Sequence, residues 1–143
     1  MHLCWAILVL AAGGTYGVPY EQVETYDFEL IWKDSGSGAN KDFSIWRPKV
    51  PNSFYILGDV PKEGHSPPVF PSFGFRAKDD ASALAFPTAY SYIWDDAGSG
   101  ATWDGSFWSY SCPPGYTQLG MVAARSHSQP YVSNLRCLKT EYT

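Results

Sequence analysis

The sequence predicts an all-β fold in which two pseudo-symmetric antiparallel sheets of about four strands each pack as a sandwich or as two sides of a β-prism. Three observations predict it. Aromatic residues make up 17% of the chain, and Gly and Pro are frequent. No window shows the sustained apolar period of about 3.6 residues that a helix requires. Residues 28–76 also align with residues 90–138 at a constant shift of 62, without a gap.

The repeated segment is a whole structural unit rather than a short motif. At the shift of 62, the residues of the first copy that recur unchanged are Ile31, Trp32, Asp34, Gly36, Ser37, Gly38, Ala39, Asp42, Ser44, Trp46, Pro51, Leu57, Gly58, Val60, His65, Ser66 and Pro68. We place the two units at about residues 26–77 and 88–139, and we expect each unit to need the other to bury one face.

The first unit is expected to hold four strands, at residues 26–32, 42–47, 54–60 and 69–77. Each strand is bounded by turn residues. A glycine-rich turn follows the first strand, a proline-marked turn follows the second, and a connector rich in Pro and Gly, residues 61–68, follows the third. Because the first two strands form a hairpin, the segment Asp34–Ala39 should lie at its tip.

The second unit repeats this order, with strands at residues 90–94, 104–108, 116–123 and 131–138. Between the units, residues 78–87 form a short linker in which one turn of helix is expected around residues 80–84. Both units keep the Ile-Trp pair, Ile31-Trp32 and Ile93-Trp94, and both keep Trp46 and its counterpart Trp108. Residues that both units retain serve core packing, so we expect all of them inside.

Residues 1–17 have the pattern of a secretory signal peptide. An apolar run from Leu3 to Ala12 precedes small residues, and cleavage is expected after Gly17. The run is about ten residues long, short of the roughly 20 that a membrane-spanning helix needs. We therefore expect residues 18–143 to be secreted to the extracellular space as a single all-β domain that contains both units.

Two cysteines, Cys112 and Cys137, remain after removal of the signal peptide, in a compartment that favours oxidation. Their counterparts in the first unit are Val50 and Phe75. Both counterparts are apolar, as expected if these two positions face each other across a buried contact. We therefore predict a disulfide between Cys112 and Cys137, which would close a loop of about 25 residues and stabilise the fold by about 3 kcal/mol.

The formal net charge of −4 makes the chain mildly acidic. The sequence has neither a polybasic run nor a basic stripe with interleaved aromatic residues. Nucleic acid is therefore not expected as a partner, and neither is an anionic membrane.

The pattern Ile-Trp-x-Asp-x-Gly-Ser-Gly-Ala-x-x-Asp, then Ser-x-Trp-Arg-Pro, then Pro-x-x-Phe-x-x-Leu-Gly-Asp-Val, runs from Ile31 to Val60. It resembles the vacuolar protein sorting-associated protein 62 family, and the resemblance covers nearly all of the chain after the signal peptide. The family's name implies vacuolar trafficking, whereas the resemblance itself implies a fold and little chemistry. The second unit departs from the pattern where Ser109-Tyr110 replaces Arg47-Pro48 and Met121 replaces Asp59.

The two glycine loops are the first candidate binding site. Asp34 and Asp42 in one loop, and Asp96 and Asp104 in the other, offer the oxygen ligands that Ca²⁺ prefers, although their spacing does not match an EF-hand loop. The alternative is structural: Asp34 and Asp96 accept hydrogen bonds from glycine amides and fix turns in which the glycines adopt positive φ. We expect no cofactor other than this candidate calcium.

Trp103 is the second candidate. Its counterpart is Lys41, and it lies in a predicted exposed turn next to Asp104. An exposed Trp beside carboxylates is the type of surface that stacks on a sugar ring or inserts into a membrane interface. With Tyr110 and the loop carboxylates it would form a lectin-like site; the alternative is a lid over the loop.

No catalytic residue is predicted. His65-Ser66 and His127-Ser128 recur at the shift of 62. A Ser/His catalytic pair would need a third orienting group and a nucleophile elbow, and Gly-x-Ser-x-Gly does not occur, so hydrogen bonds that stabilise turns are the favoured interpretation. Paired carboxylates such as Asp95-Asp96 would point apart on a strand.

These observations predict a secreted, non-enzymatic, β-rich binding or extracellular-matrix module with ligand contacts at the Gly-Ser-Gly loops. An extracellular protein, a glycan or a matrix component is the expected partner. One alternative is lectin-like carbohydrate binding. The other is a membrane-binding or pore-forming protein, which would need a long amphipathic hairpin that the sequence lacks.

Overall fold

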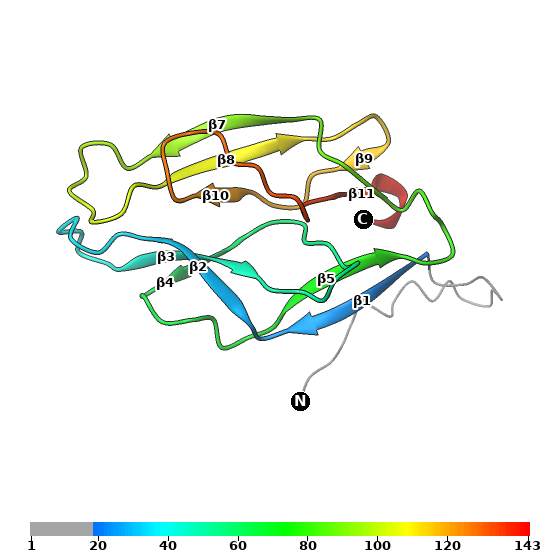
Figure 1. Ribbon diagram of the computed structural model, residues 1–143, viewed down its shortest axis with the longest axis horizontal. Coiled ribbons are helices and arrows are strands. Elements are labelled where there is room, and N and C mark those ends of the chain that lie inside the picture. Colours follow the sequence, from blue (N-terminus) through cyan, green and yellow to red (C-terminus); the bar gives the residue numbers. More distant parts are fainter. Residues whose placement is uncertain (1–18) are drawn as a thin grey trace.

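The computed structural model describes residues 19–143, which form two layers of β-strands (Figure 1). The predicted signal peptide, residues 1–17, lies outside the described residues. The strands are β1 (Tyr20–Thr25), β2 (Phe28–Lys33), β3 (Phe43–Pro48), β4 (Val60–Glu63), β5 (Ser72–Ala77), β6 (Leu84–Ala85), β7 (Ala89–Asp95), β8 (Ser106–Ser111), β9 (Tyr116–Thr117), β10 (Val122–Ala124) and β11 (Cys137–Lys139). A short 3-10 helix, η2 (Thr140–Tyr142), follows β11. Residues 19–143 contain no helix long and apolar enough to span a membrane.

The all-β prediction is confirmed, but the expected four strands per sheet are wrong. The sheets have two or three antiparallel strands, in the orders β1-β5, β2-β3-β4, β10-β8-β7 and β6-β11-β9. The reason lies at Gly58 and Gly120, which were expected inside long strands. A Cβ on Gly58 would lie 3.0 Å from the Gly120 Cα, and Asp59 N–H donates to the Met121 carbonyl at 2.8 Å. Contact between the units thus replaces ladder pairing at these segments.

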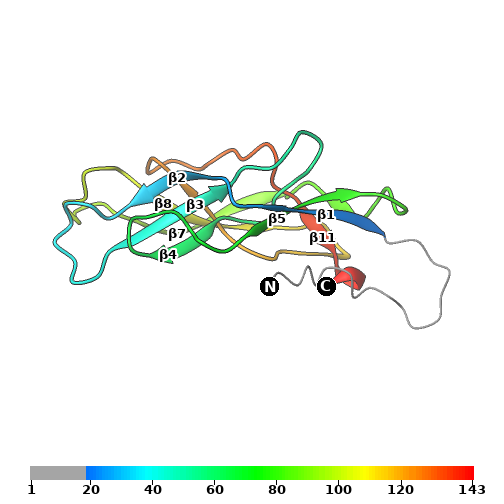
Figure 2. The same cartoon turned by 90° about the horizontal axis from the view of Figure 1, so that it is seen from below.

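The β2–β3 and β7–β8 hairpins lie in different layers and share one ladder pattern. Figures 1 and 2 show their glycine loops at the same end of the molecule. In β2–β3, Leu30 pairs with Trp46 and Trp32 with Ile45. In β7–β8, the pairs at the shift of 62 are Tyr92 with Trp108 and Trp94 with Phe107. Each ladder has its irregularity at the residue between, Ile31 or Ile93.

β1 and β6 lie where the sequence was not expected to form any strand, and all of β4 except Val60 lies in the expected connector, residues 61–68. β1 pairs with β5 along its whole length, from Tyr20 opposite Ala77 to Thr25 opposite Ser72. In the linker, the expected turn of helix is instead an isolated hydrogen-bonded turn. Ala83 N–H donates to the Asp80 carbonyl at 3.0 Å, which closes a single turn, and the chain then enters β6. β6 is held in place because it pairs with β11.

The central core contains Trp108, Tyr110 and Val122 of the second unit together with Ile56 of the first. Trp46 and Trp108 are buried as predicted. The indole N–H of Trp46 donates to the Ser44 Oγ at 2.9 Å, and that of Trp108 donates to the Ser106 Oγ at 2.8 Å. Both units therefore satisfy the polar atom of this core tryptophan in the same way.

An ion pair is buried between the layers. The Arg47 guanidinium donates to both oxygens of Asp59, at 2.9 and 2.8 Å, and the Asp59 side chain is only 1% exposed. Both partners also reach Ala123: Arg47 donates to its carbonyl and Asp59 accepts from its N–H, each at 2.8 Å. The pair thus links the first unit to β10 of the second.

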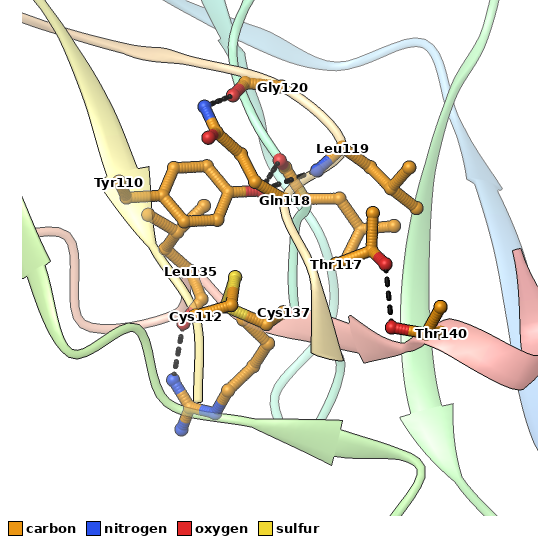
Figure 3. Close-up of a disulfide and its surroundings, with 11 residues drawn as sticks. Tyr110, Cys112, Thr117, Gln118, Leu119, Gly120, Leu135, Cys137 and Thr140 are labelled. Carbon is orange, nitrogen blue, oxygen red and sulfur yellow. Dashed lines mark hydrogen bonds between the residues drawn. A yellow bond between two sulfur atoms is a disulfide. The ribbon is translucent and has the colours of Figure 1, made fainter. Parts of the chain in front are cut away.

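The predicted disulfide between Cys112 and Cys137 is present, with a Cα–Cα distance of 6.0 Å. Figure 3 shows it beside Tyr110 and Leu135 in the core. Phe75, the expected first-unit counterpart of Cys137, is not its structural equivalent, because the two ladders differ in register by one residue.

The ladders show this shift directly. In the first unit, Gln22 pairs with Phe75. At the shift of 62 its counterpart Leu84 should then pair with Cys137, but it pairs with Leu138. The register of β11 is therefore displaced by one position relative to that of β5.

Cys137 consequently takes the ladder position of Gly74. It pairs with Ala85, the counterpart of Val23, which pairs with Gly74. A Cβ on Gly74 would lie 2.7 Å from the Val50 Cγ1. The contact that the disulfide replaces in the second unit is thus Val50 against Gly74.

Both ends of the described chain lie together. The rings of Tyr20 and Tyr142 have centroids 6.2 Å apart. The Tyr142 hydroxyl donates to Asp80 at 2.6 Å, and the same carboxylate pairs with Lys139 at 3.0 Å. These contacts place η2 at the end of the molecule away from the glycine loops (Figure 1).

Candidate functional site

The two glycine loops contact each other at one end of the molecule. The first, residues 34–42, joins β2 to β3, and the second, residues 96–104, joins β7 to β8. Thr102 N–H donates to the Ser35 carbonyl at 2.8 Å. A Cβ on Gly36 would lie 3.3 Å from the Gly100 carbonyl oxygen. The glycines at the expected positions adopt positive φ, which lets both loops turn tightly: Gly36, Gly38, Gly98 and Gly100.

Asp34 anchors the base of the first loop. Its Oδ1 accepts a hydrogen bond from Phe43 N–H at 3.0 Å and lies 2.7 Å from the Nε2 of His65. Burial opposes ionisation of this carboxyl, but the hydrogen bonds to His65 and Phe43 outweigh it and lower the pKa of Asp34. Asp42 is more distant, with its Oδ2 3.9 Å from the Nδ1 of His65.

Asp96 anchors the second loop in the same way. Its Oδ1 accepts from Gly105 N–H at 2.8 Å and lies 2.6 Å from the Nε2 of His127. Despite burial, these hydrogen bonds lower the pKa of Asp96. The bond to Asp96 raises the pKa of His127, opposed by desolvation and assisted by the charge of Asp104. Asp96 and His127 therefore form an ion pair at any pH that lies below the raised pKa of His127 and above the lowered pKa of Asp96.

Each unit thus gathers two carboxylates and one imidazole whose ligand atoms lie within 4.8 Å of one another: Asp34, Asp42 and His65, and Asp96, Asp104 and His127. Ca²⁺ takes six to eight oxygen ligands, and an imidazole suits transition metals better. The described side chains of each group supply fewer oxygens than calcium needs. The geometry favours the structural role of Asp34 and Asp96. The main-chain N–H groups that donate to these carboxylates belong to Phe43 and Gly105, which follow the loops, and not to the central glycines that the sequence analysis expected.

The sequence did not connect His65 to Asp34 or His127 to Asp96. It favoured turn-stabilising hydrogen bonds for both histidines without identifying the acceptors. One signal was available, because the spacing from Asp to His is the same in both units. A spacing kept twice indicates a contact that both units need.

A largely apolar cavity of about 450 Å³ opens beside the two loops. The indole of Trp94 and the ring of Phe107 lie 4.9 Å apart in its wall, and Trp32 lies 5.6 Å from Trp94, nearly edge-on. Its lining residues are Trp32, Asp34, Ser37, Gly38, Ala39, Phe43, Trp94, Ser99 and Phe107. The cavity therefore combines an aromatic wall with a rim of loop residues.

The expectation that both Ile-Trp pairs lie in the core holds for only one of them. Trp32 is 3% exposed, but Trp94 is 39% and Ile93 50% exposed. The difference arises at one residue of the partner loop. Gly105 leaves room for the Trp32 ring, because a Cβ there would overlap the indole. The counterpart of Gly105 is Phe43, whose ring lines the cavity instead.

Trp103 and Tyr110 are placed differently from the sequence prediction. Trp103 is half-buried, with the Arg125 guanidinium 4.3 Å and the Lys33 ammonium 5.4 Å from its ring centroid. Two cationic side chains of the protein itself thus lie against the indole ring of Trp103. Tyr110 is 2% exposed, and its hydroxyl donates to the Leu57 carbonyl at 2.5 Å. Its hydroxyl serves the contact between the units, so Tyr110 belongs to the core and not to a ligand site.

Comparisons with known proteins agree with this architecture. The sequence matches the family described as vacuolar protein sorting-associated protein 62 over residues 15–143. The crystal structure of GNIP1Aa from Chromobacterium piscinae is similar, with a TM-score of 0.74 and 25% sequence identity; the match covers 86% of this chain and 24% of that chain. The described fold thus spans about a quarter of the length of GNIP1Aa. No curated protein matches the sequence.

Proposed function

The chain belongs to the vacuolar protein sorting-associated protein 62 family, and from its fold and its aromatic cavity we propose that it is a non-enzymatic binding module. The ligand site in this proposal is the cavity beside the two glycine loops. One observation carries the proposal: Trp94 is 39% exposed in the wall of that cavity, although its counterpart Trp32 is buried.

Exposure of Trp94 costs stability, because burial of an aromatic ring is among the largest apolar gains available to a small domain. A cavity with an aromatic wall and a few polar groups is the usual form of a small-molecule or saccharide site. The loops that border it are anchored at Asp34 and Asp96 and touch each other through Thr102 and Ser35. Such anchoring limits the conformational entropy that binding would remove.

The arrangement of polar residues supports binding rather than catalysis. Ser35 Oγ lies 3.4 Å from the Nδ1 of His65, whose Nε2 faces Asp34. In the second unit the counterpart of Ser35 is Ala97, so the serine is not part of what the two units share. We propose that both histidines fix the loops and that the protein has no enzymatic activity.

A glycan is the ligand class we favour for the cavity. Apolar faces of sugar rings stack on indoles, and sugar hydroxyls hydrogen-bond to rim groups such as the Ser37 and Ser99 side chains or the Asp34 carboxylate. Trp94 replaces Trp103 as the stacking residue, because the ring of Trp103 already contacts Arg125 and Lys33.

We further propose that the protein acts outside the cell. The disulfide between Cys112 and Cys137 supports this placement, because such bonds persist in oxidising compartments. The signal peptide expected at residues 1–17 is the second reason.

A glycan array probed with the labelled protein tests the proposal. Ala39→Trp adds a large ring to an exposed loop residue that lines the cavity, and it removes no core contact. We expect it to weaken every bound glycan at least tenfold. Ala81→Trp makes the same change at an exposed position in the linker turn and should bind like the wild type. Glycan binding that Ala39→Trp leaves intact, or an array without any binding, would refute a glycan site in this cavity.

A further inference from the structure

Strands β2 and β7 occupy equivalent positions at the outer edge of their hairpins. Both lie at the end of a three-stranded sheet, in the orders β2-β3-β4 and β10-β8-β7. Their ladders match residue by residue at the shift of 62, with the same irregularity at Ile31 and Ile93. The main-chain oxygens on the two outer edges therefore have the same arrangement.

The edge of β2 is covered from within the chain. β10 packs against it, with Ala123 in one cluster with Ile31. The Arg125 guanidinium, which follows β10, donates to the main-chain oxygen of Ile31 at 3.1 Å and also to that of Leu30. Its other face lies on the ring of Trp103. Arg125 thus caps the open edge of the strand.

The edge of β7 has no such cover among the described residues. Tyr92 is 56% and Ile93 50% exposed, against 6% for Ile31. At the shift of 62 the counterpart of Arg125 is Glu63, an acceptor that cannot donate to a carbonyl. Among residues 19–143, no side chain donates to the main-chain oxygen of Tyr92 or Ile93. Figure 1 shows β7 on the outer side of its layer, while β10 faces the β2 layer.

The charges around this edge select a cation. Asp95 directly follows the exposed residues, and its carboxylate accepts the Tyr92 hydroxyl at 3.0 Å. Asp104, whose charge acts on His127 together with that of Asp95, has a side chain that is 73% exposed. An arginine brings a planar fork of donors and stacks on aromatic rings, of which Tyr92 and Trp94 are partly free.

We infer that the β7 edge docks an extended segment of a partner protein that carries an arginine, with its guanidinium on the main-chain oxygens of Tyr92 and Ile93. The internal contact of β10 with β2 is the template for this interface. In that template Ala123 and Arg125, two residues apart on one side of an extended segment, contact the strand together. A partner needs the same pair: a small apolar residue and an arginine two positions later.

A second copy of this chain is a poorer occupant. The counterpart of β10 in the first unit is β4, and Glu63 stands there in place of the arginine. Docking β4 of another copy on β7 would bring Glu63 toward Asp95 and Asp104, which repel it. Charge therefore favours a different protein as the partner.

The test uses a fluorescent peptide with the sequence of residues 120–128, which contains both Ala123 and Arg125. Fluorescence anisotropy measures its binding to the full-length protein. We expect saturable binding, and we expect the peptide with Arg125→Gln to bind at least tenfold more weakly. Equal binding of the two peptides, or no binding of either, would overturn the inference.

Two protein variants identify the surface. Ile93→Lys places a positive charge on the β7 edge and should weaken the arginine peptide at least tenfold. Val69→Lys makes the same change at another exposed aliphatic residue, 86% exposed, and should leave binding unchanged. Unchanged binding by Ile93→Lys would place the peptide elsewhere and refute the site.

Two further measurements distinguish this inference from the cavity proposal and from self-association. Ala39→Trp, which fills the cavity, should bind the peptide like the wild type, so failure of the cavity proposal and failure of this one remain distinguishable. Light scattering reports self-association. A dimer that Ile93→Lys disperses would mean that a second copy occupies the edge, and it would contradict the assignment of a different protein.

Discussion

Gly58 and Gly120, which occupy equivalent positions in the two units, contact each other where the units meet. A Cβ on Gly120 would lie 2.8 Å from the Leu57 carbonyl oxygen and 3.1 Å from the Gly58 Cα. We expect Gly120→Ala to lower the free energy of unfolding by about 1–3 kcal/mol, because backbone on both sides must move to admit the methyl group.

Urea unfolding measures this change. Ser133→Ala, at an exposed position, is the control and should stay within about 0.5 kcal/mol of the wild type. A Gly120→Ala protein as stable as that control would mean that the units separate easily at this point.

The Arg47–Asp59 pair gives a second prediction. Asp59→Met leaves the Arg47 charge without its buried partner and should cost about 3–5 kcal/mol. Arg47→Ser combined with Asp59→Met places in the first unit the residues that the second unit has at the equivalent positions, Ser109 and Met121. The double variant should recover at least half of that loss, since no uncompensated charge remains. A double-mutant cycle on unfolding free energies tests this, and additive losses would argue against the coupling.

The disulfide gives a third prediction. Cys112→Val combined with Cys137→Ala should lower the unfolding free energy by about 3 kcal/mol relative to the oxidised protein. Valine is the residue of the first unit at the position equivalent to Cys112. Dithiothreitol should destabilise the wild type by a similar amount and leave the double variant unaffected. Wild-type stability that does not respond to reductant would contradict the prediction.

The pH dependence of stability should depend on His127. Its pKa in the folded protein is raised above the ordinary value of 6.5 by the hydrogen bond to Asp96. A group with a raised folded pKa contributes stability that is full below its unfolded pKa and is lost as the pH rises through its folded pKa. Asp96, with a pKa below 3.8, stays ionised until the pH falls further. His127→Gln should therefore destabilise the protein more at pH 5.5 than at pH 9. Chemical denaturation at both values measures the difference, and an equal loss at the two would rule out an ion pair.

Calcium gives a fifth prediction. In each Asp–His group one carboxylate already bonds to the imidazole and the other lies near it, so these side chains offer Ca²⁺ few free oxygen ligands. We therefore expect 1 mM Ca²⁺ to leave the free energy of unfolding unchanged. A calcium site whose dissociation constant is a hundredth of that concentration would raise the free energy of unfolding by about 2.7 kcal/mol. Thermal melts with calcium and with a chelator decide between these outcomes.

The hairpins, the burial of Trp46 and Trp108, and the disulfide could be predicted from the sequence because they depend on alternation and repeat position. The different exposure of Trp32 and Trp94 could not. It arises from Gly105 and Phe43, which are equivalent in the repeat: Gly105 makes room for the ring of Trp32, whereas Phe43 lines the cavity together with the exposed Trp94. The two equivalent tryptophans therefore differ in exposure because the residues around them differ.

Tyr110 and β1 illustrate the same limit. Tyr110 is buried because its hydroxyl reaches Leu57 of the other unit, a contact without any local pattern. β1 is polar in alternation and short, and it forms a strand because β5 offers a complete edge to pair with. Tertiary pairing decides such segments more than their own composition does.

The packing of Tyr20 on Tyr142 has a practical consequence for handling the protein. Both residues lie away from the glycine loops, so an affinity tag or biosensor tether attached after Thr143 emerges from the opposite pole of the domain. Immobilisation by that route presents the aromatic cavity to the mobile phase, and the sensor surface itself will not obstruct it.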